Sequence, residues 1–330
     1  MILHPGIIAL LVSSGLISFL ALYAAWFGIG ILRSWDIGSG SSRQLELERR
    51  TYLISTILSY VFGFQLLSLF LFVYTADSLC PLFVGAMCAA GTLNVNAFGY
   101  PVLALKISNF LLAGLWLIVN TADNRAEDYP LIRKKYALLL FIVPLLVLET
   151  VLQFLYVRGL NPDIITSCCG SLFSPSSQGV AAELASLPAG PVEAAFTLLL
   201  LLAVASGMVF SARGKGGYAV ALSAAAAFAA GILALISFIG LYVYELPTHH
   251  CPFCVLQPEY HRIGYLLYIG LLGGAVSGLG VGVLMPFRRI PSLSAIVPDL
   301  QRSLARVMVL FYVLLGITTL LIVVTSNLHL

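Results

Sequence analysis

Long apolar runs alternate with short polar segments along the whole chain. Eight of these runs reach the roughly 20 residues that a helix needs to cross the hydrocarbon core of a bilayer. They cover residues 6–31, 52–76, 102–122, 136–157, 191–211, 218–244, 263–285 and 306–327. The pattern therefore predicts an all-α integral membrane protein with eight transmembrane helices and no soluble domain.

The composition agrees with this class. The 330 residues are 60% hydrophobic and only 9% charged, with a mean hydropathy of +1.01. A soluble globular domain carries about 25% charged residues. The lipid bilayer must therefore contact most of the surface, and a net charge of only +3 gives no reason to expect nucleic-acid binding.

The Lys and Arg residues indicate the orientation. Three polar segments contain four basic residues each and a short turn contains two, so only Lys106, Arg158 and Arg262 of the 17 remain elsewhere. Basic loops stay in the cytoplasm according to the positive-inside rule. Both termini are then expected to be extracytoplasmic, with the chain in a cell inner membrane. The basic segments are 32–51, 123–135, 212–217 and 286–306.

The chain divides into two halves of four predicted helices, residues 1–158 and 191–330, joined by an outer connecting loop over 159–190. Both halves place a Cys-Pro pair between their second and third helices and a Gly-Tyr pair after it, Gly99-Tyr100 and Gly264-Tyr265. A parallel four-helix repeat would produce this echo. A shared preference for Pro and Gly-Tyr at helix starts would also produce it.

All six cysteines fall in the predicted outer segments and none falls in an apolar run. They form three pairs in the sequence, and the outer face of a membrane is a compartment in which disulfides persist. This arrangement favours thiol–disulfide or metal chemistry over buried, inert thiols. The pairs are Cys80 with Cys88, Cys168 with Cys169, and Cys251 with Cys254.

The C-P-F-C pair of Cys251 and Cys254 is the strongest local signal. A two-residue spacing allows a disulfide that opens and closes readily, and it also allows two thiolates to bind one metal ion. His249, His250 and His261 flank the pair. One or two of these histidines are the expected additional ligands if the pair binds zinc or copper.

The other two pairs differ in chemistry. Cys80 and Cys88 enclose a short apolar loop and are expected to be within disulfide reach of each other. A bond between the adjacent Cys168 and Cys169 would be strained and easily reduced. The vicinal pair is therefore expected to exchange with the other cysteines or to bind a soft metal.

Few charges lie within the apolar runs. Glu149 is deep within the fourth run, and Lys106 and Asn109 lie in the third. A carboxylate in lipid is a functional candidate by default, with Lys106 its nearest plausible partner. The favoured alternative is that Lys106 extends to the outer surface. Lys106, Arg262 and Glu149 are also the residues expected near a bound quinone.

In its parts the chain is similar to two families of membrane thiol oxidoreductases, DsbB and vitamin K epoxide reductase. The similarity lies in Cys251 and Cys254 near a helix start and in a second cysteine pair, Cys80 with Cys88 or Cys168 with Cys169, on the same face. It implies electron transfer from thiols to quinone. The chain departs from both four-helix families in its eight helices, its vicinal cysteines and its His-His pair before C-P-F-C.

Three functions follow from these patterns. The first is a membrane thiol–disulfide oxidoreductase that acts on periplasmic thiol proteins through all six cysteines. The second is a subunit that binds or transports copper, zinc or mercury. The third is a structural subunit of a larger membrane complex, in which disulfides only brace the loops.

Overall fold

The structure is a computed structural model and describes residues 3–39, 41–166, 183 and 185–328. This part of the chain contains helices and no strand, and eight helices are long and apolar enough to cross a membrane. The predictions of an all-α fold and of eight helices able to cross a membrane are therefore confirmed for this part of the chain. Cys168 and Cys169 lie outside the described residues. The long helices are α1 (Pro5–Ser34), α2 (Ser42–Ser78), α4 (Gly99–Asn124), α5 (Ile132–Arg158), α8 (Ala189–Arg213), α9 (Gly217–Ala234), α11 (Ile263–Val283) and α12 (Ile296–Thr325).

Short helical elements connect or extend the long helices. The π-helix η2 and α10 continue α9, so one span covers Gly217–Tyr244. Both Gly-Tyr pairs lie at the start of a helix, as expected: α4 begins at Gly99 and α11 at Ile263, one residue before Gly264. The short elements are η1 (Cys80–Leu82), α3 (Ala89–Leu93), η2 (Leu235–Ile239), α10 (Gly240–Tyr244), η3 (Cys254–Leu256), η4 (Pro258–Tyr260), η5 (Met285–Arg289) and η6 (Pro291–Leu293).

The chain forms two compact units that only partly follow the sequence halves. Unit 1 consists of residues 1–75, 96–160 and 286–298, and unit 2 of residues 76–95, 161–285 and 299–330. Each unit contains four of the long helices. The segment with Cys80 and Cys88, which belongs to the first half in sequence, is part of unit 2. All described cysteines therefore lie in one unit.

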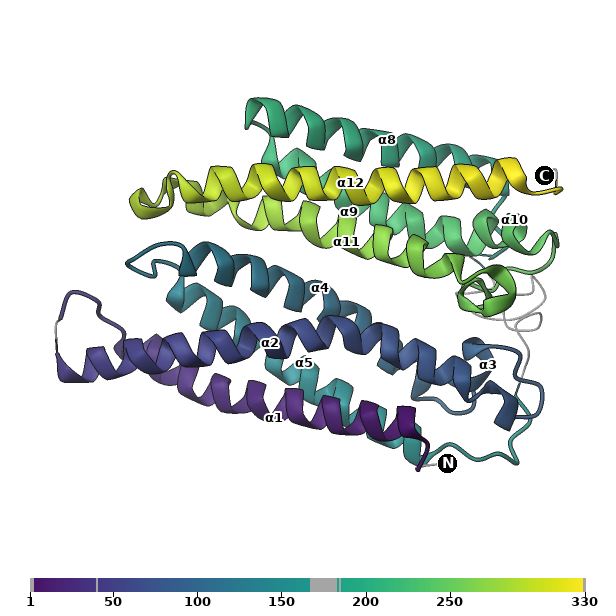
Figure 1. Cartoon of the computed structure of the whole chain (residues 1–330), viewed down its shortest axis with the longest axis horizontal. Helices are drawn as coiled ribbons and strands as arrows, with labels where there is room; N and C mark the ends of the chain where they lie inside the picture. The colour runs from purple at the N-terminus through teal and green to yellow at the C-terminus, as the bar shows by residue number, and fades with distance from the viewer. Residues whose placement is uncertain (1–2, 40, 167–182, 184, 329–330) are drawn as a thin grey trace. The chain divides into compact units, whose positions relative to one another are not determined.

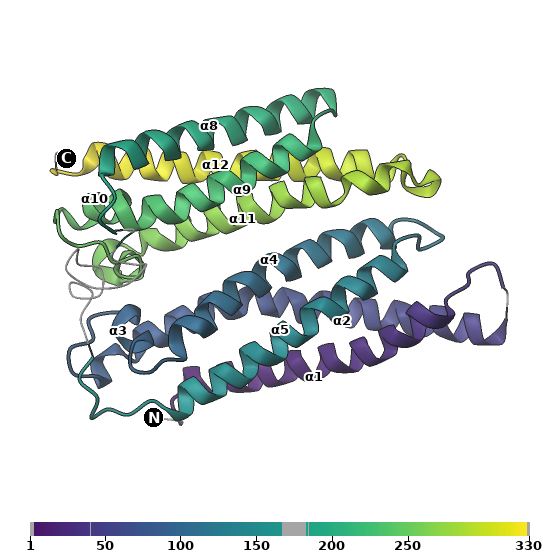
Figure 2. The ribbon, with the colours of Figure 1, turned by 180° about the vertical axis from the view of Figure 1, so that it is seen from behind.

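Unit 1 is a bundle in which α5 packs against both α1 and α4 (Figure 2). Its apolar core contains an edge-to-face pair of rings, Phe62 on α2 and Trp116 on α4, with centroids 4.9 Å apart. The Trp116 indole donates a hydrogen bond to the carbonyl of Lys135 on α5. The large aromatic side chains thus join three helices at one level.

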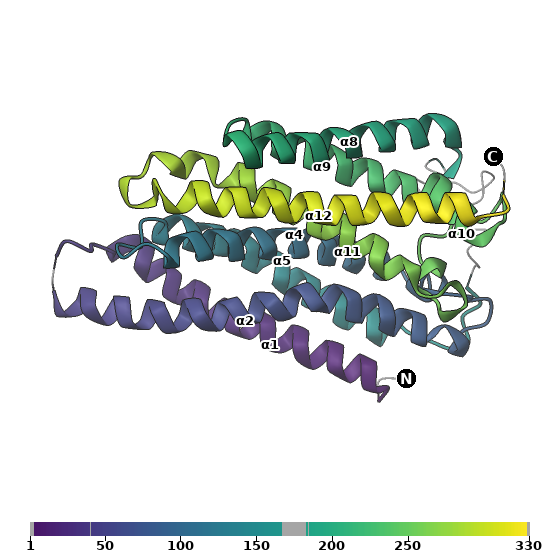
Figure 3. The ribbon, with the colours of Figure 1, turned by 45° about the horizontal axis from the view of Figure 1, so that its top comes forward.

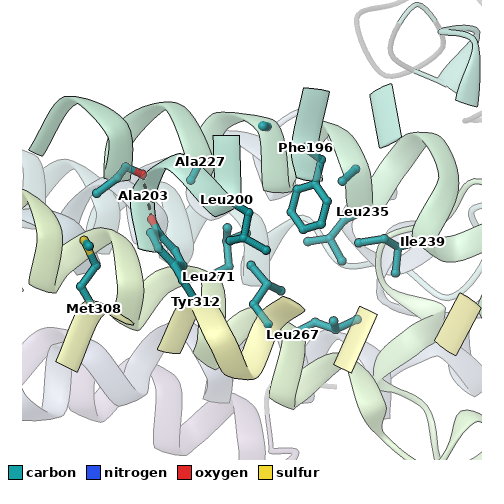
Figure 4. Close-up of a cluster of buried hydrophobic side chains, with 14 of the residues drawn as sticks. Phe196, Leu200, Ala203, Ala227, Leu235, Ile239, Leu267, Leu271, Met308 and Tyr312 are labelled. Carbon is teal, nitrogen blue, oxygen red and sulfur yellow. Dashed lines mark hydrogen bonds between the residues drawn. The ribbon is translucent and has the colours of Figure 1, made fainter. Parts of the chain in front are cut away.

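In unit 2, the four helices α8, α9, α11 and α12 run side by side (Figures 1 and 3). Small residues let α9 and α11 approach closely, because a Cβ atom at Gly278 would collide with Ala224 and one at Gly282 with Ala221. This spacing of small residues is typical of helix contacts in membranes. Larger side chains, among them Phe196, Leu200 and Tyr312, fill the interior (Figure 4).

Two helices begin well before their apolar runs. α2 begins at Ser42 and α12 at Ile296. Arg50 and Arg302 therefore lie on helices, whereas the sequence pattern predicted loops at these positions. Acidic partners explain the extension, because Glu46 pairs with Arg50 and Asp299 with Arg302 at helical spacing. The polar ends of these helices therefore extend past the apolar segment.

Candidate functional site

Three cysteine sulfurs from distant parts of the sequence meet inside unit 2. The Sγ atoms of Cys88, Cys251 and Cys254 all lie within 4.8 Å of one another. The Sγ atoms of Cys88 and Cys251 are 3.5 Å apart. All three side chains are buried, with at most 4% of any residue exposed. We call this group the thiol cluster.

The loop that contains Cys88 is anchored by contacts with Thr166. Gly85 adopts a positive φ of 87°, where the carbonyl of Thr166 approaches too closely for any side chain. Thr166 also donates from its backbone N–H to the carbonyl of Val84 at 3.0 Å and from its hydroxyl to the carbonyl of Gly91 at 2.8 Å. The loop is thus fixed on both sides of Cys88, which precedes the first residue of α3 in an extended conformation.

Two tyrosines hold the C-P-F-C segment. The Tyr244 hydroxyl donates to the carbonyl of Cys251 at 2.5 Å, and the Tyr268 hydroxyl donates to the carbonyl of Pro252 at 2.6 Å. Cys254 begins the short helix η3, which packs closely on the start of α11 because Gly264 has no side chain to collide with Val255. The backbone that carries Cys251 and Cys254 is therefore held in place by these contacts.

Gln257 joins the two cysteine segments. Its side-chain amide donates to the carbonyl of Met87 at 2.8 Å and to the Asp77 carboxylate at 3.3 Å. The same Asp77 oxygen accepts the backbone N–H of Ala89 at 3.2 Å. Gln257 and Asp77 thus keep Cys88 beside Cys251 and Cys254, a positioning role that no motif in the sequence indicates.

The sulfurs are close enough together for all three to contact one metal ion. A tetrahedral Zn²⁺ ion with Zn–S bonds of about 2.3 Å holds its thiolate sulfurs about 3.8 Å apart. The Cys88 and Cys251 sulfurs, 3.5 Å apart, are close to that value. No two sulfurs of the cluster are more than 4.8 Å apart. The 3.5 Å separation is also far longer than the roughly 2.05 Å of a disulfide.

The three histidines that flank C-P-F-C differ in their surroundings, and none belongs to the thiol cluster within the described residues. His250 uses its Nδ1 atom in a 3.0 Å hydrogen bond with the carbonyl of Ile236, and His261 is exposed. His249 packs edge-on against Tyr244, with a buried Nε2 atom that has no hydrogen-bond partner in the described chain. Burial lowers the pKa of His249, which favours its neutral form.

The remaining predicted cysteines are distributed differently. Cys80 begins η1, is half-buried, and does not belong to the thiol cluster among the described residues. A disulfide between Cys80 and Cys88 therefore stays a prediction, as does exchange by Cys168 and Cys169. The Cys88 sulfur lies 3.5 Å from that of Cys251, which is 163 residues away in sequence.

The intramembrane charges lie in unit 1 and form a separate group. Lys106 donates to Glu149 at 2.7 Å, and both side chains are almost fully buried. The favoured expectation that Lys106 extends to the outer surface is therefore wrong: the neighbouring carboxylate offsets the cost of burying the ammonium group. Asn109 at 2.6 Å and Gln65 at 2.8 Å donate to the other Glu149 oxygen.

These contacts occupy the groups that were expected near a quinone. The Lys106 ammonium also donates to Ser68 at 2.7 Å and lies over the Phe72 ring. Glu149 accepts three hydrogen bonds. Arg262 is exposed at the turn before α11. Quinone binding by Lys106, Glu149 and Arg262 stays a prediction.

A second buried ion pair joins α4 and α5. Lys135 lies 2.7 Å from Asp123, and both side chains are fully buried. Lys135 also donates to Asn120 at 3.0 Å. Lys135 belongs to the predicted basic segment 123–135, but α5 begins at Ile132, and the Lys135 side chain is buried in the bundle. Its charge therefore has a partner within the protein.

The comparisons with known proteins leave the site to be interpreted from its own geometry. No protein-family model, no characterised protein and no solved structure matches the chain.

Proposed function

We propose that the chain is a multi-pass membrane protein that binds one soft metal ion, Zn²⁺ or Cu⁺, through Cys88, Cys251 and Cys254. The observation that carries this proposal is the meeting of three buried sulfurs within 4.8 Å. Thiolates are the ligands that zinc and copper(I) prefer in proteins. Three thiolates so close together would repel one another in a buried site, and a bound cation removes that cost.

His249 is the most suitable fourth ligand. It is two residues from Cys251, and its buried Nε2 atom has no partner in the described chain. A Cys₃His set would complete the tetrahedral coordination of zinc, whereas three thiolates alone suit copper(I). The choice between the two metals therefore depends on whether the imidazole turns toward the sulfurs.

Thiol–disulfide exchange is the second candidate function. The 3.5 Å approach of Cys88 to Cys251, with Cys254 beside both, would allow a disulfide and an attacking thiol in one cluster. Oxidation of two thiols releases two electrons and two protons, which a quinone would accept as it becomes a quinol. We place this function second because buried sulfurs are inaccessible to the thiols of a protein substrate.

Metal content and thiol state together separate the two functions. The protein, purified without oxygen or chelator, is expected to contain about one equivalent of zinc or copper. Added Co²⁺ should give intense sulfur-to-cobalt absorption. Metal-free protein with a reducible Cys88–Cys251 bond that re-forms with an added quinone would favour exchange and count against the metal centre.

We also propose that the thiol cluster faces the periplasm, with both termini on the same side of a cell inner membrane. The support is the distribution of basic residues. Fourteen of the 17 lie in the segments 32–51, 123–135, 212–217 and 286–306, and the cysteines lie in the alternate segments. A parallel repeat of four helices per half is consistent with this orientation.

A reporter enzyme fused after Leu330 tests the orientation. A periplasm-dependent reporter such as alkaline phosphatase is expected to be active there, and a fluorescent protein that requires the cytoplasm is expected to be dark. The same two reporters placed after Lys215 should give the opposite result. Fluorescence after Leu330 would contradict the proposed orientation.

A further inference from the structure

Unit 2 contains a groove that is lined by residues other than the cysteines. It has a volume of about 280 Å³ and lies between α8, η2 and α12. Apolar side chains form most of its wall. The lining residues are Glu193, Phe196, Thr197, Leu200, Leu201, Phe238, Gly316, Thr319, Leu320 and Val323.

The groove opens to the lipid-facing side of the unit. Leu201 and Leu320 line it and are both more than 60% exposed. Phe196 and Leu200 line its inner wall and are buried in the interior of unit 2 (Figure 4). A hydrocarbon chain could therefore enter from the bilayer without crossing a polar surface.

The wall of this apolar groove also contains polar side chains, among them Glu193 and Thr319. Glu193 is about one turn from the start of α8, and Leu201 lies about 12 Å further along the same helix. The Glu193 carboxylate makes no ion pair or hydrogen bond within the described chain. Thr319 is only 6% exposed, and its hydroxyl has no hydrogen-bond partner there. A carboxylate and a buried hydroxyl without partners next to an apolar channel indicate an amphipathic ligand.

We infer that this groove binds one phospholipid with a primary-amine headgroup, such as phosphatidylethanolamine. Its ammonium group would donate to Glu193, and an acyl chain would lie along Phe196, Leu200 and Phe238. Charge complementarity selects the headgroup: a carboxylate repels an anionic lipid, and a trimethylated choline cannot donate a hydrogen bond to it.

Native mass spectrometry of the full chain, released from nanodiscs of POPC with equal small fractions of POPE and POPG, tests this inference. We expect one POPE molecule to be retained in preference to POPC and POPG. Glu193→Gln should weaken POPE retention about tenfold, the loss expected for one charge-assisted hydrogen bond. Glu259→Gln, an exposed carboxylate in the same unit, should leave retention unchanged.

A second variant tests the groove without altering charge. Leu201→Trp would fill the channel and is expected to reduce POPE retention at least as much as Glu193→Gln. Leu202→Trp, on the neighbouring lipid-facing position that does not line the groove, is the control. Equal retention of the three lipids, or full POPE retention in Glu193→Gln or Leu201→Trp, would overturn the inference.

Discussion

Glu149→Gln is expected to destabilise unit 1 by about 3–5 kcal/mol, because it leaves the Lys106 ammonium buried without its counter-charge. The side chains of the pair are at most 2% exposed, so water cannot replace the lost carboxylate. The substitution also turns an acceptor of three hydrogen bonds into an amide. The NH₂ group of that amide is a donor, and it would face another donor in either orientation: the Lys106 ammonium or the side-chain amides of Asn109 and Gln65.

The measurement is the unfolding free energy in mixed detergent and SDS micelles, followed by circular dichroism. Glu46→Gln is the matched control, since it removes the same charge from an exposed pair on α2 and should cost less than about 1 kcal/mol. The double variant Lys106→Met/Glu149→Leu should recover most of the loss, because it removes both buried charges. An unchanged stability of Glu149→Gln would show that the ion pair does not stabilise the bundle.

The eight spans follow from a rule that acts locally, whereas the Lys106–Glu149 pair was the less favoured of two expectations for Lys106. An apolar run of about 20 residues has one favourable state in lipid. A carboxylate within such a run needs a partner, and Lys106 is one of very few cations within the predicted spans. The partners Gln65 and Ser68 were not predicted, because polar uncharged residues are common in membrane helices and their spacing on α2 does not identify their neighbours.

The thiol cluster was predicted only in part for the same reason. Spacing along the chain groups Cys251 with Cys254 and Cys80 with Cys88, but it cannot show which loops meet in space. The contact between Cys88 and Cys251 depends on the Gln257 and Asp77 hydrogen bonds, which join segments 180 residues apart. The one signal in the sequence is that both halves contain a Cys-Pro pair between their second and third helices. It identifies the two cysteine segments but does not show that they are in contact.

Cys88→Ser is expected to weaken zinc binding by at least about 100-fold, since a structural zinc site gains about 10–16 kcal/mol from four ligands and loses one of them here. Cys251→Ser and Cys254→Ser should have similar effects, because each removes one of the three buried sulfurs of the cluster. Affinity is measured without oxygen by competition with a chromophoric chelator. Circular dichroism confirms that each variant keeps its helices.

Cys80→Ser is the informative control for that series. Cys80 shares its loop with Cys88 but does not belong to the cluster of three sulfurs, so its removal should leave zinc affinity within about twofold of the original protein. If Cys80 and Cys88 instead act as the pair predicted from the sequence, both substitutions should have the same effect. Equal losses in Cys80→Ser and Cys88→Ser would therefore reject the three-sulfur centre, and a loss confined to Cys88, Cys251 and Cys254 would assign the ligands.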